Sequence, residues 1–92
     1  MVLGEAAATI CLESGENEKA IAYIEGFGYA TENLKHSISI SAEATCFQKS
    51  MKMALGKMNP EEIDVIITHS PGTIQGDLSE MKAIEIVFGN AI

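Results

Sequence analysis

The sequence predicts an α/β fold in the order β-β-α-β-α with a mixed sheet. Three observations predict it. Short apolar runs rich in β-formers alternate with two longer segments whose apolar residues recur every three or four positions, and polar or Gly-containing turns separate them. The 92 residues predict a single segment, 1–92, because the chain is too short for two independent cores.

Three segments predict strands. Ala6–Leu12 is apolar on both faces, although its alanines leave a helix open as an alternative. A polar turn leads to Ala20–Gly28, which predicts an antiparallel hairpin, and Gly26 and Gly28 indicate a bulge or a close backbone approach. Ile63–Thr68 carries Val65, Ile66 and Ile67 in a row and predicts a central parallel strand covered on both faces.

The polar segment Asn33–Ser41 predicts an ordered loop before the first helix. Ser41 is the expected N-cap of this helix, and Asn59-Pro60 is its expected end. Its apolar stripe consists of Ala44, Phe47, Met51, Leu55 and Met58.

The second helix is expected to start near Asp77, which forms a capping-box pattern with Glu80. Gly89 is the expected stop. The predicted buried side consists of Leu78, Met81, Ile84, Val87 and Phe88.

The composition excludes some classes of protein. Six basic residues, all Lys, against 13 acidic ones give a net charge of −7, so no nucleic acid and no anionic membrane are expected as partners. The apolar runs are shorter than the roughly 18 residues of a membrane span, and no basic region precedes an apolar one at the start. Cys11 and Cys46 are interpreted as buried free thiols. A cytoplasmic location is therefore expected.

His69 is the strongest chemical candidate, because it follows the best predicted strand, where α/β sheets bind ligands. We expect it to face a cleft. Its imidazole could donate to a developing oxyanion or act as a base, and a structural role stays open. His36 lies in a polar loop and is interpreted as solvated, and Cys46 has no obvious base beside it. No metal-ligand spacing or phosphate loop is present, so no metal and no cofactor are expected.

The order of several motifs resembles the β-ketoacyl-acyl carrier protein synthases, which are condensing enzymes of the thiolase-like superfamily. The similar segments are Val2-Leu3-Gly4-Glu5-Ala6-Ala7, Tyr23-Ile24-Glu25-Gly26-Phe27-Gly28, Asn59-Pro60-Glu61-Glu62-Ile63-Asp64-Val65-Ile66, Thr68-His69-Ser70-Pro71-Gly72-Thr73 and Gly76-Asp77 with Glu80-Met81-Lys82-Ala83-Ile84 and Val87-Phe88-Gly89. The resemblance implies that the chain is the first part of the second, C-terminal half of a thiolase-like fold.

It also implies an activity: decarboxylative condensation of an enzyme-bound acyl group with a malonyl extender on acyl carrier protein, in fatty acid or polyketide synthesis. The resemblance implies that His69 hydrogen-bonds the thioester carbonyl of the extender and that Glu80 organises the site, which makes these two the candidate catalytic residues. It places Thr73 near the pantetheine arm of the carrier.

Two departures qualify the resemblance. The family usually has Gly and Thr where this chain has Ser70 and Pro71, and Pro71 removes a hydroxyl and a backbone N–H beside His69. The nucleophilic Cys and second His of the family have no counterpart in these residues, so the isolated chain is expected to be inactive. The resemblance also implies that a further strand and the other half of the fold are absent from these residues, which would leave apolar surface uncovered, so the isolated chain is expected to form a homodimer. A non-catalytic thiolase-like interaction module and a degenerate synthase homologue are the alternatives.

Overall fold

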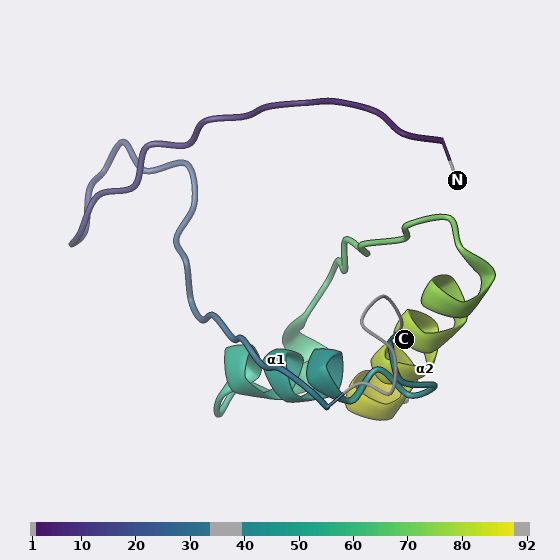
Figure 1. Cartoon of the computed structure of the whole chain (residues 1–92). Helices are drawn as coiled ribbons and strands as arrows, with labels where there is room; N and C mark the ends of the chain where they lie inside the picture. The colour runs from purple at the N-terminus through teal and green to yellow at the C-terminus, as the bar shows by residue number, and fades with distance from the viewer. Residues whose placement is uncertain (1, 34–39, 90–92) are drawn as a thin grey trace.

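The chain is known from a computed structural model that describes residues 2–33 and 40–89 (Figure 1). These residues form helix α1 (Thr45–Leu55), the 3₁₀ turn η1 (Pro60–Glu62) and helix α2 (Ile74–Phe88). The two helices pack against each other. The apolar core lies at this contact and is small, and its buried members are Ala44, Ala83, Ile84 and Phe88.

The predicted mixed sheet is wrong for this structure, because the described residues contain no strand. Residues 2–33, the N-terminal arm, begin away from the helices, pass across the top of the view in Figure 1, turn back, and come down to α1. Residues 63–68 cross from η1 towards α2 as an extended segment that pairs with no strand in the described part of the chain. Ile21 in the arm and Ile67 in this segment are almost wholly exposed.

The strands were predicted from their apolar patterns, which indicate which side chains share a face. Such a pattern does not show that a second strand lies alongside to form the hydrogen bonds of a sheet. A strand satisfies its backbone N–H and C=O groups only through an adjacent strand, and an isolated hairpin is marginal in water. The polar turn expected between the first two segments is present, with Gly15 at φ 86° and the Lys19 N–H donating to Asn17 Oδ1 at 2.9 Å. The turn alone does not pair the two segments that flank it.

Helix α1 is shorter than predicted at both ends. Ala44, with φ 47° in the left-handed region, is its N-cap in place of Ser41, whose Oγ accepts from the Thr45 N–H at 3.2 Å. Gly56 ends the helix before Asn59, because its positive φ of 56° turns the chain away. Asn59 and Pro60 instead start η1, where Asn59 and Glu62 form a capping box.

Helix α2 starts earlier than predicted. Thr73 is its N-cap, and its Oγ1 accepts from the Gly76 N–H at 3.1 Å, so the expected start near Asp77 is wrong. Gly89 is the C-cap, as predicted. Ile84 and Phe88 are buried as expected, but Leu78 and Met81 are exposed. Apolar residues occur all round this helix, so periodicity alone could not identify the face that α1 covers.

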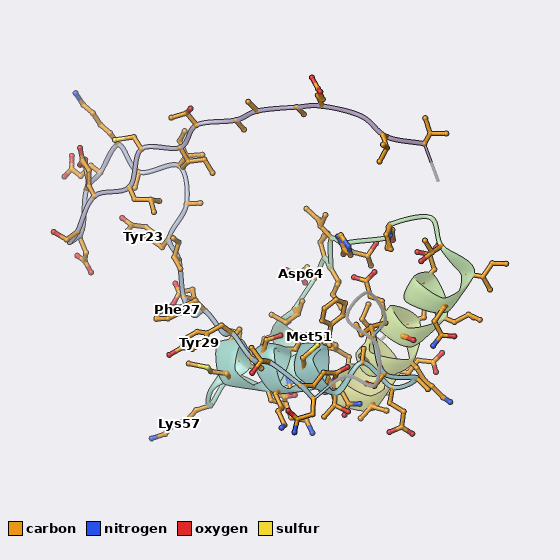
Figure 2. The ribbon with its side chains drawn as sticks, viewed as in Figure 1. Tyr23, Phe27, Tyr29, Met51, Lys57 and Asp64 are labelled. Carbon is orange, nitrogen blue, oxygen red and sulfur yellow. The ribbon has the colours of Figure 1, made fainter. Side chains whose placement is uncertain are left out.

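The close backbone approach predicted at Gly26 and Gly28 is confirmed. A Cβ at Gly26 would overlap the carbonyl oxygen of Ala54, and one at Gly28 would overlap that of Ser50. The end of the arm therefore lies directly on the backbone of α1, which only residues without a side chain permit. Figure 2 shows Tyr23, Phe27 and Tyr29 along this part of the arm as it comes down to the helix.

Candidate functional site

The candidate site is the His69 loop, residues 69–73, between the extended segment and α2. The Glu80 carboxylate, only 7% exposed, accepts two consecutive backbone N–H groups: His69 N donates to Oε1 at 2.6 Å and Ser70 N donates to Oε2 at 2.8 Å. Hydrogen bonds to an ionised acceptor are stronger than neutral ones. Glu80 thus fixes the backbone at His69 from the first turns of α2.

A second carboxylate, that of Asp77, holds the C-terminal end of the loop at Gly72. The Gly72 N–H donates to Asp77 Oδ1 at 3.2 Å, and Pro71 has no N–H to offer. Each backbone donor from His69 to Gly72 is therefore engaged by α2. These N–H groups are therefore not available to an oxyanion bound at this loop, and only side chains could donate hydrogen bonds to it. The His69 side chain is exposed and is the nearest candidate donor.

The loop backbone is also sharply bent. Ser70 has φ 39°, in the left-handed region that disfavours residues with a Cβ. Its hydroxyl pairs with that of Thr68, on the other side of His69. The resemblance leads us to expect glycine where this chain has Ser70, and the positive φ is a physical reason for glycine at this position.

The structure brings two of the three predicted site residues into one unit. His69 and Glu80 meet through the loop backbone, and Thr73 lies at its end, where its Oγ1 accepts from the Gly76 N–H and its hydroxyl donates to no other described residue. The cleft expected at His69 stays a prediction. A polar hollow of about 470 Å³ lies elsewhere, lined by Thr31, Glu32, Asn33, Ser41, Thr45 and Lys49.

Glu32 is a structurally important residue that the sequence did not reveal. Its carboxylate accepts from Ser41 N at 2.8 Å, Ser41 Oγ at 3.0 Å and Cys46 N at 2.9 Å. The backbone hydrogen bond from Ser41 is the main cause that lowers the pKa of Glu32 below its ordinary value. These partners lie 9 and 14 residues further along the sequence, and capping patterns relate only residues a few positions apart.

The structure argues against Cys46 as a nucleophile. Burial, and then the nearby Glu32 charge, raise the pKa of its thiol, whereas an activated thiol needs a lowered pKa. Both cysteines are free, but Cys11 is exposed, contrary to the prediction of a buried thiol. His36 lies outside the described residues. Within residues 2–33 and 40–89 no cluster of metal-ligating side chains occurs, and no helix there is long and apolar enough to cross a membrane.

Comparison with known proteins covers the region that contains this loop. The C-terminal domain of β-ketoacyl synthases matches residues 21–92, a range that contains the whole His69 loop and both helices. The chain therefore belongs to the β-ketoacyl synthase family, as the motifs predicted.

Individual relatives are more distant. The chain is 33% identical over 93 residues to polyketide β-ketoacyl synthase 1 of Streptomyces virginiae, covering 96% of this chain and 22% of that protein. It is 32% identical over 96 residues to 3-oxoacyl-(acyl-carrier-protein) synthase 2 of Staphylococcus aureus, covering 98% of this chain and 24% of that protein. It thus spans about a quarter or less of these relatives. No solved structure matches.

Proposed function

We propose that this chain is a segment of a condensing acyltransferase that joins an enzyme-bound acyl group to a malonyl extender on acyl carrier protein, in fatty acid or polyketide synthesis. The observation that carries the proposal is the His69 loop. Its backbone is held by Glu80 within the family-matched region, and the imidazole of His69 is left exposed. A fixed backbone with a free imidazole is what a hydrogen-bond donor to a reacting carbonyl requires.

In this reaction, His69 acts on the extender. The bond between the carboxylate and the α-carbon of the malonyl group breaks, and carbon dioxide leaves. The electron pair of the broken bond stays with the α-carbon and the thioester carbonyl as an enolate. The His69 N–H donates to the thioester oxygen on which that negative charge develops. The enolate carbon then attacks the acyl thioester of a nucleophilic Cys, which leaves as thiolate. Cys46, with its raised pKa, does not fill that role.

Glu80 and Thr73 support His69 in this proposal. Glu80 is a positioning residue, since it holds the loop through the His69 and Ser70 N–H groups. Thr73 keeps a hydroxyl proton to donate to the pantetheine arm while its oxygen caps α2. A homodimer and a cytoplasmic location belong to the same proposal, and the free thiols of Cys11 and Cys46 fit a reducing compartment.

A segment exchange tests the proposal. The matching segment of the Staphylococcus aureus synthase is replaced by this chain, with and without His69→Ala, and both acyl loading and malonyl decarboxylation are measured. Acyl loading on the nucleophile of the host reports a folded chimera. We expect the chimera to decarboxylate and His69→Ala to lose decarboxylation while keeping acyl loading.

A chimera that loads acyl groups but never decarboxylates malonyl carrier protein would contradict the proposal and favour a degenerate homologue or an interaction module. The isolated chain supplies a second measurement. It should gain no mass on Cys11 or Cys46 when incubated with an acyl-carrier thioester, because the proposal places the acyl-bearing nucleophile outside these residues and the pKa of the Cys46 thiol is raised.

A further inference from the structure

Ser70 has a backbone conformation that its residue type disfavours. Its φ of 39° lies in the left-handed region, where glycine is the unstrained residue because it has no Cβ. Contacts on both sides hold this conformation. The Ser70 N–H donates to Glu80 Oε2 at 2.8 Å, and its hydroxyl pairs with that of Thr68. The Pro71 ring lies against Gly76, where an added Cβ would come within 3.0 Å of Pro71 Cγ. Backbone strain that surrounding contacts maintain is concentrated at functional sites.

The side chain of Ser70 lies between the two substrate contacts of the proposed function, which assigns the thioester oxygen to His69 and the pantetheine arm to Thr73. Of the residues between these two, Pro71 and Gly72 have no polar side chain, so only Ser70 brings a side-chain hydrogen-bonding group. The N–H groups of the loop are already engaged by the carboxylates of α2. An arm that runs from His69 to Thr73 therefore meets one polar group on its way, the Ser70 hydroxyl.

The hydroxyl pair of Thr68 and Ser70 can bind a further group. Both side chains are exposed. Each hydroxyl has one proton and two lone pairs, and the bond between them uses one proton and one lone pair. The pair therefore keeps one proton to donate and lone pairs with which to accept, whichever hydroxyl is the donor. An amide presents a C=O and an N–H side by side, so it can hydrogen-bond to the pair in either arrangement.

We propose that Ser70 is a specificity-determining residue whose hydroxyl, paired with that of Thr68, hydrogen-bonds the pantetheine amide nearest to the thioester. This inference rests on the proposed condensing function and deepens it. The amide follows the thioester along the pantetheine arm as Ser70 follows His69 along the loop. Its hydrogen bond is the same in the bound substrate and in the transition state for decarboxylation, because no charge develops on the amide. Loss of the hydroxyl should therefore raise KM and leave kcat unchanged.

The test uses the chimera with the Staphylococcus aureus synthase and two small malonyl thioesters. The thioester of N-acetylcysteamine carries the amide, and in the pentyl thioester methylene groups replace it. Decarboxylation is measured as release of carbon dioxide over a range of thioester concentrations. Ser70→Gly and Ser70→Ala should each raise the KM of the amide-bearing thioester about three- to tenfold, the loss of one neutral hydrogen bond. The kcat values and the KM of the pentyl thioester should stay unchanged.

Control variants separate substrate binding from folding. Ser70→Gly relieves the strain of the positive φ and Ser70→Ala keeps it, so the glycine variant of the 92-residue chain should have the higher urea midpoint. An equal rise in KM in two variants of different stability then belongs to the hydroxyl. Ser14→Gly, at an exposed serine in the turn of the arm, is the matched control and should change neither KM. His69→Ala should instead lower kcat for both thioesters.

Three results would overturn the inference. One is an unchanged KM for the amide-bearing thioester in both Ser70 variants of a chimera that decarboxylates through His69, which would leave the condensing function standing without Ser70. Another is an equal rise in KM for both thioesters, which would make the effect of Ser70 independent of the amide. The third is a chimera that loads acyl groups but decarboxylates neither thioester, which would contradict the condensing function itself and this inference with it.

Discussion

At the scale of single residues, Glu80 has the clearest structural task. It belongs to α2 but makes its hydrogen bonds to the His69 loop, 10 and 11 residues earlier in the chain. The sequence pattern assigned it to a capping box with Asp77, whereas the structure uses both carboxylates to hold the loop. A local motif identified the right side chains and the wrong partners, because Asp and Glu can accept from any nearby N–H group.

Glu80→Ala is therefore expected to destabilise the chain by about 1–3 kcal/mol, since it leaves the His69 and Ser70 N–H groups without their acceptor. Urea denaturation measures this loss, and amide exchange at His69 and Ser70 should accelerate with it. Glu85→Ala, at an exposed position on the same helix, is the matched control and should change stability by less than about 0.5 kcal/mol. Equal effects of the two substitutions would show that the Glu80 hydrogen bonds to the His69 loop contribute nothing to stability.

Glu32 predicts a pH dependence of stability. Its pKa is lowered in the folded chain from an ordinary value of 4.5, so its contribution is fully present above that value and is lost as the pH falls through the folded-state pKa. The unfolding free energy of the native chain should exceed that of Glu32→Gln most at pH 7, and the difference should shrink on acidification below about pH 4.5.

Urea titrations from about pH 7 to pH 3 measure this difference, with Glu25→Gln, an exposed position in the arm, as the control. A constant difference between native chain and Glu32→Gln over this range would contradict the assignment. Nothing in the sequence around Glu32 indicated this role, because the donors at Ser41 and Cys46 reach it only through the folded chain.

At the scale of elements, the arm and α1 meet through Gly26 and Gly28. Gly28→Ala should destabilise this contact by about 1–3 kcal/mol, because the new methyl group overlaps the Ser50 carbonyl and the arm must move away. Gly4→Ala, where nothing lies within 4 Å of the added Cβ, is the matched control and should have little effect. Thermal unfolding and the fluorescence of Tyr29, which lies beside the contact, report the change. If Gly28→Ala left the stability unchanged, the arm would not be in close contact with α1 at this position.

The elements also show where sequence patterns suffice. Both helices were predicted because their hydrogen bonds are internal, and local residues such as Gly89 determine where they end. The strands were not found because their hydrogen bonds need a neighbouring segment, and residues 6–12, 20–28 and 63–68 have none among the described residues. Likewise, His69 was predicted as a site residue from its place after an apolar run, and the cleft expected beside it depended on a sheet, of which the described residues contain no strand.

At the scale of the whole molecule, the chain exposes more surface than a finished domain of its size. Its accessible area is 8146 Å², whereas a folded monomer of 9.8 kDa is expected to expose about 5,200 Å². Its radius of gyration is 15.5 Å against about 12 Å for a compact chain of this length. The excess of about 2,900 Å² is more than three times the roughly 800 Å² that each partner buries in a standard interface.

Much of this surface is apolar, since Ile10, Ile21, Tyr29 and Ile67 are each at least 74% exposed. Burying apolar surface is worth about 25 cal/mol per Å², so covering even part of the arm is favourable by several kcal/mol. The opposing term is repulsion between chains of charge −7, which salt screens. The balance predicts association through the arm that strengthens with salt, the reverse of the salt dependence of an ion-pair contact.

The isolated chain should therefore sediment as a dimer or larger species at roughly 50 µM, with the two-fold dimer as the simplest closed form. Raising the salt concentration should increase the associated fraction. Ile21→Ser with Tyr29→Ser should shift the chain towards the 9.8 kDa monomer, because both side chains are exposed apolar groups of the arm. Glu85→Ser, an exposed substitution on α2 that leaves the arm unchanged, should leave association intact. A single folded monomer of the native chain at this concentration, at both low and high salt, would show that the arm is stable in water without a partner.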